Sequence, residues 1–171
     1  MSTSLSLAQV GDAVLYKKAV PINIIELPEV QRLIDHMIAL AYKMHADGIA
    51  APQVFESKRL FILMVKPHVS SDKRMPLVII NPRIITCSLE QEDGWEGCLS
   101  IPGVKGLVPR FTMIKAEFMT RTGKKRRKIF KNFTARVFQH EYDHLEGLVF
   151  WDRTAIVVSV ERRETSHRKV S

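Results

Sequence analysis

The sequence predicts an α+β fold, because three kinds of pattern follow one another along the chain. A helical pattern covers residues 28–44, short apolar runs with strand character follow as far as residue 130, and a second helical pattern covers residues 132–146. This order of helix, strands, hairpin and helix is typical of the α+β class. The 171 residues predict one domain, 1–171, with a loosely ordered tail at 160–171.

Composition and charge narrow the class of protein. Hydrophobic residues make up 46% of the chain, and two cysteines are too few for a disulfide framework. The sequence shows neither a secretory signal nor an apolar run long enough to span a membrane, so we expect a cytoplasmic protein with no membrane partner. The net charge of +8 is compatible with ribosome contact. No aromatic residues accompany the basic tail, which argues against direct, sequence-specific binding of nucleic acid.

The first helix is predicted from Pro28, which suits a first helical turn, to about residue 44. Its core-facing stripe is made by Val30, Leu33, Ile34, Met37, Ile38 and Ala41. Residues 48–53 (GIAAPQ) follow, where small residues let the backbone approach a ligand and Gln53 offers an amide. Taken alone, such a segment is more often a tight structural turn.

The middle of the chain predicts strands joined by turns. Apolar runs place them at residues 59–65, 77–80, 83–88, 112–119, 126–130 and 148–151. Asn81-Pro82 separates the second from the third, and the basic run 124–128 is expected in solvent on a hairpin. Residues 93–103 hold three glycines around Cys98, which predicts a shaped loop rather than a strand interior. Cys87 is expected to be a buried, inert thiol.

The second helix is predicted over residues 132–146, capped by Asn132 or Thr134 and followed by Gly147. One of its faces is predicted to point toward the core. That face carries Phe133, Val137, His140 and His144.

Residues 139–144 (QHEYDH) contain the H-E-x-x-H pattern. Positions i and i+4 share a helical face, so His140 and His144 can bind one metal ion. Glu141 lies about 100° around the helix, beside the metal, where it can take a proton from bound water.

A third ligand is needed, and the sequence offers few candidates. One peptidase clan would have a histidine at position 150, but Phe150 cannot bind a metal. Glu161 and Glu164 could serve, as a glutamate does in another clan, but they lie in a charged tail with little apolar sequence to anchor it. Cys98 remains, and a thiolate with two imidazoles and an open fourth position is a known type of catalytic set.

Three stretches together resemble the signature motifs of the peptide deformylase family. They are residues 48–53 (GIAAPQ), 96–100 (EGCLS) and 139–144 (QHEYDH), in the family's order. The resemblance extends over roughly residues 5–152. It implies antiparallel β-sheets packed around a central helix that carries the H-E-x-x-H motif.

The resemblance implies a metal-dependent hydrolase that removes the N-formyl group from the N-terminal formyl-methionine of newly made polypeptides. Its metal would be held by Cys98, His140 and His144. The usual physiological ion of the family is Fe²⁺, and Zn²⁺, Ni²⁺ or Co²⁺ can occupy the site.

Catalytic and binding roles also follow from the resemblance. Glu141 would act as general base and acid, while the Gln53 amide and the Leu99 backbone N–H would stabilise the developing oxyanion. Glu96 and Arg110 would form an ion pair behind the cysteine. Contacts with the substrate are implied for Gly48, Ile49, Gly97, Phe133 and Val137.

The sequence departs from the family pattern at two places. Ala46 stands where the first glycine of the first motif is usual, and it would be strained if that position needs a positive φ. The tail is short, whereas many bacterial members carry a long C-terminal helix that contacts the ribosome. Two other functions stay open: an H-E-x-x-H zinc endopeptidase, and a non-catalytic deformylase-like binding protein.

Overall fold

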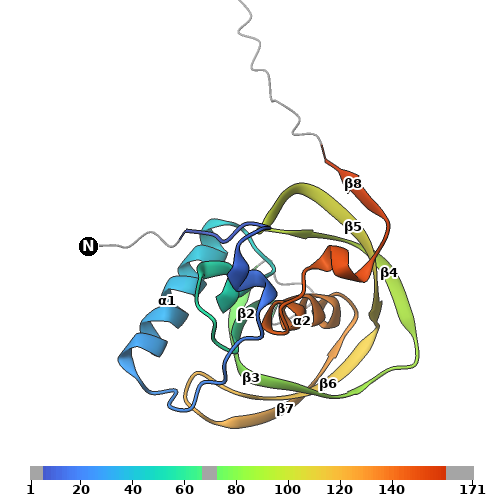
Figure 1. The fold of residues 1–171 in the computed structure, drawn as a ribbon. Helices are drawn as coiled ribbons and strands as arrows, with labels where there is room; N and C mark the ends of the chain where they lie inside the picture. The colour runs from blue at the N-terminus through green and yellow to red at the C-terminus, as the bar shows by residue number, and fades with distance from the viewer. Residues whose placement is uncertain (1–5, 67–72, 161–171) are drawn as a thin grey trace, which may run out of the picture.

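The structure is a computed structural model that describes residues 6–66 and 73–160. Over these residues the chain forms a five-stranded sheet of order β1-β2-β3-β6-β7 and a three-stranded sheet of order β4-β5-β8, with every neighbouring pair antiparallel (Figure 1). The strands are β1 (Gly48–Ala50), β2 (Leu60–Val65), β3 (Met75–Cys87), β4 (Gln91–Cys98), β5 (Ile101–Phe111), β6 (Met113–Met119), β7 (Lys125–Lys131) and β8 (Val157–Ser159). The helices are η1 (Ala13–Tyr16), α1 (Pro28–Lys43), η2 (Ala51–Val54), α2 (Asn132–Leu145) and η3 (Phe150–Arg153).

Strand β2 is buried on both faces, which explains its unbroken apolar sequence. Alternate side chains of a strand point to opposite sides. Leu60 and Ile62 therefore pack against the apolar stripe of α1, while Phe61 and Leu63 pack against α2. The rings of Phe61 and Phe138 meet edge to face, with centroids 5.0 Å apart. The predicted stripe of α1 is confirmed, although Ile38 is only half-buried.

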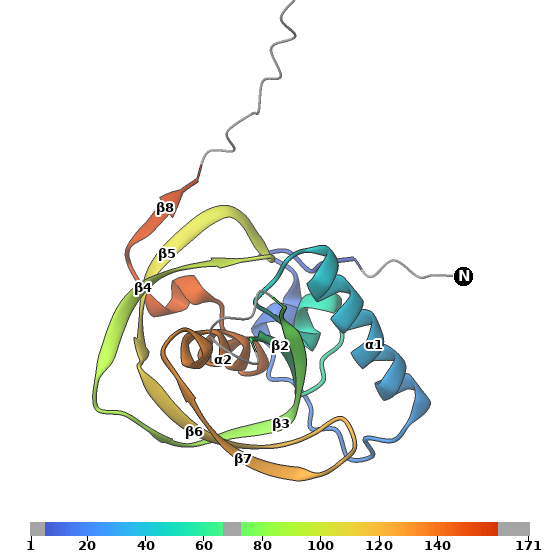
Figure 2. The same cartoon turned by 180° about the vertical axis from the view of Figure 1, so that it is seen from behind.

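Helix α2 lies between the two sheets. It contacts β1, β2, β6 and β7 of the larger sheet and β5 of the smaller one. In both views the strands curve around it (Figures 1 and 2). The helix begins after Lys131, whose side chain makes no cap hydrogen bond, so the predicted caps at Asn132 and Thr134 are wrong. It ends before Gly147, which has the expected positive φ of 76°.

Strand β3 differs from its prediction. The runs at 77–80 and 83–88 form one strand rather than two, because residues 81–82 are accommodated by a shift in the β3–β6 register. Asn81 adopts a φ of 49°, a conformation that asparagine tolerates, and its amide donates to the Ile22 carbonyl. Cys87, expected to be buried, is exposed near the end of this strand.

The segment around Cys98 is also more regular than expected. Residues 93–98 belong to β4, and only Leu99 and Ser100 form the turn into β5. The glycines provide room for close packing: a Cβ at Gly94 would lie 2.6 Å from Cζ of Arg136. The prediction of a shaped loop is therefore wrong. These residues pair with the long strand β5, and the sequence alone did not reveal this pairing.

The end of the described chain gives one more correction. The strand predicted at 148–151 is instead a turn leading into η3, where the Val149 N–H donates to the Asp152 carboxylate. The hairpin β6–β7 and the exposure of its basic residues are confirmed. Residues 161–171, including Glu161 and Glu164, lie outside the described part. No helix of the described residues is both long and apolar enough to cross a membrane.

Candidate metal centre

Three side chains that could bind a metal ion converge between the two sheets. The Cys98 sulfur and ring nitrogens of His140 and His144 all lie within 4.8 Å of one another. Helix α2 presents the two imidazoles from successive turns, with ring centroids 5.1 Å apart, and β4 delivers the thiol at its last residue. The Cys98 Sγ and the His144 Nε2 are 3.4 Å apart. The predicted trio is thus brought together in space.

A buried ionic network lies behind His140. Glu96 on β4 accepts a hydrogen bond from the His140 Nδ1 at 2.9 Å, which leaves the Nε2 for a metal. Arg110 on β5 binds the same carboxylate through two hydrogen bonds of 2.9 Å and reaches Asp143 at 2.6 Å. Arg153 donates to Asp143 from η3. The predicted Glu96–Arg110 pair therefore exists, and it joins the smaller sheet to helix α2.

Electrostatics favour a thiolate in this cluster. Burial disfavours ionisation of Cys98, but His144 and then His140 outweigh it and hold the pKa of the thiol well below its usual range. Burial likewise opposes ionisation of Glu96, yet hydrogen bonds from Arg110 and His140 lower the pKa of this carboxyl to about 2. The cluster is therefore supplied with anionic charge, which suits a divalent cation.

Glu141 occupies a confined position beside the three ligands. It is 3% exposed, and burial raises its pKa to about 7 against the opposing effect of the two histidines. Its carboxylate packs directly against Gly48, where a Cβ would lie 2.5 Å from the Glu141 Oε1. The other oxygen, Oε2, is buried with no hydrogen-bond partner among the described residues. This oxygen is therefore available to hydrogen-bond a water molecule or a substrate atom.

The two predicted oxyanion donors border the same cluster. Gln53, at the third position of η2, points its Nε2 to the Cys98 Sγ at 3.4 Å and to the Ser100 hydroxyl at 3.2 Å. Its Oε1 accepts from the Ala50 N–H, which fixes the amide orientation. Leu99 follows Cys98 in the turn and lines the adjoining cavity. The hydroxyl of Ser100 was not predicted as part of the site.

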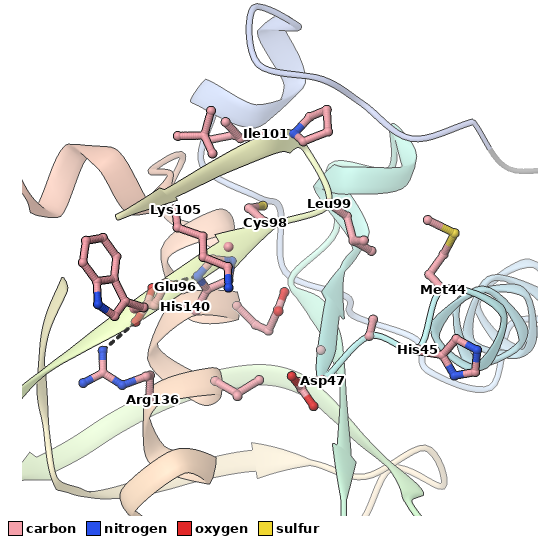
Figure 3. A pocket seen from close by; sticks show the side chains of 18 of the residues that line it. Met44, His45, Asp47, Glu96, Cys98, Leu99, Ile101, Lys105, Arg136 and His140 are labelled. Carbon is pink, nitrogen blue, oxygen red and sulfur yellow. Dashed lines mark hydrogen bonds and ion pairs between the residues drawn. The ribbon is translucent and has the colours of Figure 1, made fainter. Parts of the chain in front are cut away.

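A cavity of about 490 Å³ opens beside the cluster (Figure 3). Four of the predicted substrate-binding residues line it: Gly48, Gly97, Phe133 and Val137. The fifth, Ile49, is fully buried in the core with residues of α1 and does not line the cavity. Phe133 is 60% exposed at the rim, so the shared helical face points to the cavity at this end rather than to the core.

Other lining residues were missed. Arg136 donates to Glu96 at 3.0 Å and to the Val108 carbonyl at 2.7 Å, which holds both strands of the β4–β5 hairpin against α2. Its position four residues before His140 was the available signal, since i and i+4 share a helical face. Asp47 and Trp95 also line the cavity, and no pattern in the sequence marks them as cavity residues.

A family model for polypeptide deformylase matches residues 4–160. The chain belongs to the peptide deformylase family. Members of this family are hydrolases that remove N-formyl groups from nascent chains. The close grouping of Cys98, His140 and His144 is consistent with the binding of one metal ion by this protein.

Individual relatives agree with that assignment. A peptide deformylase 2 from a Nostoc species is 43% identical over 152 residues, which cover 87% of this chain and 85% of the relative. A class I type b peptide deformylase from Acinetobacter baumannii, solved with Met-Ala-Ser bound, is 37% identical with a TM-score of 0.81 and covers 90% of this chain and 99% of that one. The peptide deformylase from Thermotoga maritima is 33% identical with a TM-score of 0.82 over 90% and 99% of the two chains.

Proposed function

We propose that Cys98, His140 and His144 hold one divalent cation and that this centre removes the formyl group from formyl-methionyl peptides. The observation that carries the proposal is the arrangement of the three ligands, the buried Glu141 and a peptide-sized cavity on one side of α2. The proposed physiological ion is Fe²⁺, with Zn²⁺, Ni²⁺ or Co²⁺ as substitutes. When bound, such a cation supplies Lewis acidity that makes water a nucleophile near neutral pH.

Glu141 is proposed to move the proton. Its carboxylate takes a proton from the attacking water and delivers it to the amine that leaves as the formyl C–N bond breaks. The carboxylate is held by the helix on one side and by Gly48 on the other, which restricts its motion. A pKa of about 7 lets the same group accept and return a proton near neutral pH.

The Gln53 amide and the Leu99 backbone N–H are proposed to stabilise the charge that develops on the formyl oxygen. The orientation of the Gln53 amide supports this role. Its oxygen accepts a hydrogen bond from the Ala50 N–H, and its nitrogen faces the Cys98 sulfur. Removal of one such donor typically costs about 3–4 kcal/mol of transition-state stabilisation.

The free edge of β1 is proposed to bind the peptide backbone. The Met64 N–H donates to the Asp47 carbonyl, so Asp47 is hydrogen-bonded to β2. Along an antiparallel pair, residues whose backbone groups bond to the neighbouring strand alternate with residues whose groups point away. The backbone groups of Ile49 therefore face β2, and those of Gly48 face away from it. An extended peptide can add to such an edge as a further strand. Gly97, Phe133 and Val137 are proposed to surround the methionine side chain.

The cellular setting is also a proposal. Nascent chains are proposed as the substrates of a single catalytic domain, with α2 and its H-E-x-x-H motif as the central helix that both sheets support. The cytoplasm is the proposed compartment. Contact with the ribosome stays a prediction that rests on the net charge of +8.

Release of formate from formyl-Met-Ala-Ser by the Ni²⁺-loaded protein tests the proposal. We expect turnover by the natural chain and a loss of about 10²- to 10⁴-fold in Glu141→Gln, with the bound metal retained. Cleavage inside an unformylated peptide would favour the endopeptidase alternative. Peptide binding with no release of formate would favour the non-catalytic alternative.

A further inference from the structure

Asp47 places a negative charge on the wall of the cavity. It lies in the turn between α1 and β1, its side chain is about half exposed at 49%, and Figure 3 shows it at the cavity. Arg74 donates to one carboxylate oxygen at 2.5 Å and also to the carbonyls of His45 and Ala46. Arg74 does not itself line the cavity. The arginine therefore anchors the turn and offsets part of the carboxylate's charge, while the carboxylate itself borders the cavity.

The turn holds this charge in a fixed place without strain at Ala46. The positive φ of the turn falls on His45, at 51°, and Ala46 is not among the residues with positive φ. The Asp47 carbonyl accepts from the Met64 N–H at 2.8 Å, which ties the residue to β2. The departure from glycine at position 46 is thus accommodated without a positive φ at Ala46.

The direction of β1 decides which part of a peptide would reach Asp47. The strand runs from Asp47 toward Gln53, whose amide lies 3.4 Å from the Cys98 sulfur. A peptide with its formyl group at the metal ligands therefore extends along β1 toward Asp47. Gly48 packs against the Glu141 carboxylate, and Asp47 lies one residue further, about 3.3 Å along the chain, so the residues that directly follow the methionine come nearest to this carboxylate.

Lys105 is another charged side chain on the wall, but it comes from β5 in the other sheet. Its Cγ would lie 3.9 Å from a Cβ at Gly97, so its stem runs beside the residue that precedes Cys98. This cation therefore borders the cavity from the smaller sheet, whereas Asp47 borders it from the turn before β1 of the larger sheet.

We propose that Asp47 is a specificity-determining residue that favours formyl-methionyl peptides with lysine or arginine at the first or second position after the methionine. This inference rests on the proposed function. Attraction between charges at a half-exposed wall is modest, so we expect cationic peptides to exceed the neutral peptide by about 1.5- to 5-fold in kcat/KM. Acidic residues at the same positions should reduce kcat/KM by a similar factor, because like charges repel.

The test compares five peptides on each protein: formyl-Met-Ala-Ser, formyl-Met-Lys-Ser, formyl-Met-Glu-Ser, formyl-Met-Ala-Lys and formyl-Met-Ala-Glu. The ratio of kcat/KM for lysine over glutamate is measured at low and at high salt, which screens exposed charges. In Asp47→Asn the ratio should fall to about one, and in Asp47→Lys it should reverse. A matched control is Asp35→Asn, since Asp35 is also paired with an arginine, Arg121, but lies on α1 away from the cavity.

Each outcome decides one question. A ratio above one that vanishes in Asp47→Asn, weakens in salt and persists in Asp35→Asn supports the inference. A ratio of one in the natural chain, or one that is unchanged in Asp47→Asn, overturns it. If Asp47→Asn only loosens the turn, all five peptides lose kcat/KM equally, which also overturns it. Absence of turnover on formyl-Met-Ala-Ser itself contradicts the proposed function instead.

Discussion

The two sides of the cluster formed by the proposed metal ligands Cys98, His140 and His144 are built differently. Behind them, Glu96, Arg110 and Asp143 are at least nine-tenths buried, and their charged groups are paired with one another. In front, Asp47 is about half exposed and Phe133 is 60% exposed at the cavity. Loss of one partner from a buried network leaves an unpaired charge at high cost, whereas an exposed group can change cheaply. The rear wall thus fixes the chemistry, and the front wall can vary with the substrate.

The largest effect on activity is expected from a change in one of the proposed metal ligands, which lie between the buried and the exposed side. Cys98→Ala removes the only thiolate of the ligand trio, so we expect loss of bound metal and a fall in formate release of about a thousandfold or more. Metal content and kcat/KM are measured on the same preparation. A fully metal-loaded and active variant would instead point to a ligand outside the described residues, such as Glu161 or Glu164.

Gly48→Ala tests whether activity depends on the close packing of Gly48 against Glu141. The new methyl group would lie 2.5–2.9 Å from three atoms of Glu141, so this side chain must move. A displacement of about 1 Å in a catalytic group can cost about a hundredfold in rate, and we expect a loss of that order in kcat with metal retained. Gly48→Ala added to Glu141→Gln should cause little further loss. Fully additive losses would show that the glycine acts through something else.

Glu96→Gln tests the rear wall through its pH dependence. The pKa of Glu96 is lowered from its usual 4.5 to about 2, so its stabilising effect is present above pH 4.5 and is lost as the pH falls toward 2. A depression of this size corresponds to roughly 3 kcal/mol. In metal-free protein, the difference in unfolding free energy between the natural chain and Glu96→Gln should therefore shrink from pH 7 to pH 3. A constant difference would contradict the role assigned to the charge.

The same variant should also weaken metal binding. The Glu96 carboxylate orients the His140 ring, and loss of such a supporting partner typically costs about 10- to 100-fold in metal affinity. Competition with a chelator measures the change. Glu117→Gln is a suitable control, because Glu117 is a paired carboxylate on β6 that contacts no metal ligand.

The smallest effect on activity is expected from the front wall. Phe133→Ala removes a ring that is 60% exposed at the cavity rim. The lost apolar contact with the peptide is worth about 0.5–1 kcal/mol, so KM should rise a few-fold, while the free energy of unfolding should stay nearly unchanged. Phe138, on the same helix, is fully buried, and Phe138→Ala should cost about 3–5 kcal/mol of stability. Urea unfolding and steady-state kinetics separate the two. Similar losses of stability in both variants would contradict the contrast between rim and core.

Sequence reasoning worked best where a short-range pattern carries the information. The stripe of α1, the run of β2 and the pair of histidines on α2 follow from local spacing. Sequence reasoning failed where the conformation of a segment depends on a partner that is distant in the chain. The glycines of residues 94–97 suggested a loop, yet pairing with β5 makes them a strand. Ile49 was assigned to the cavity, but its strand phase turns it into the core.

The sequence by itself determined the class of chemistry, because the identities of Cys98, His140, Glu141 and His144 limit what such a site can do. Only the tertiary structure decided which walls surround them. Whether a carboxylate is buried behind the cluster, as Glu96 is, or lies half-exposed at the cavity, as Asp47 does, depends on how the strands and turns pack around α2. That arrangement is set by contacts between residues far apart in the chain, and no local spacing encodes it.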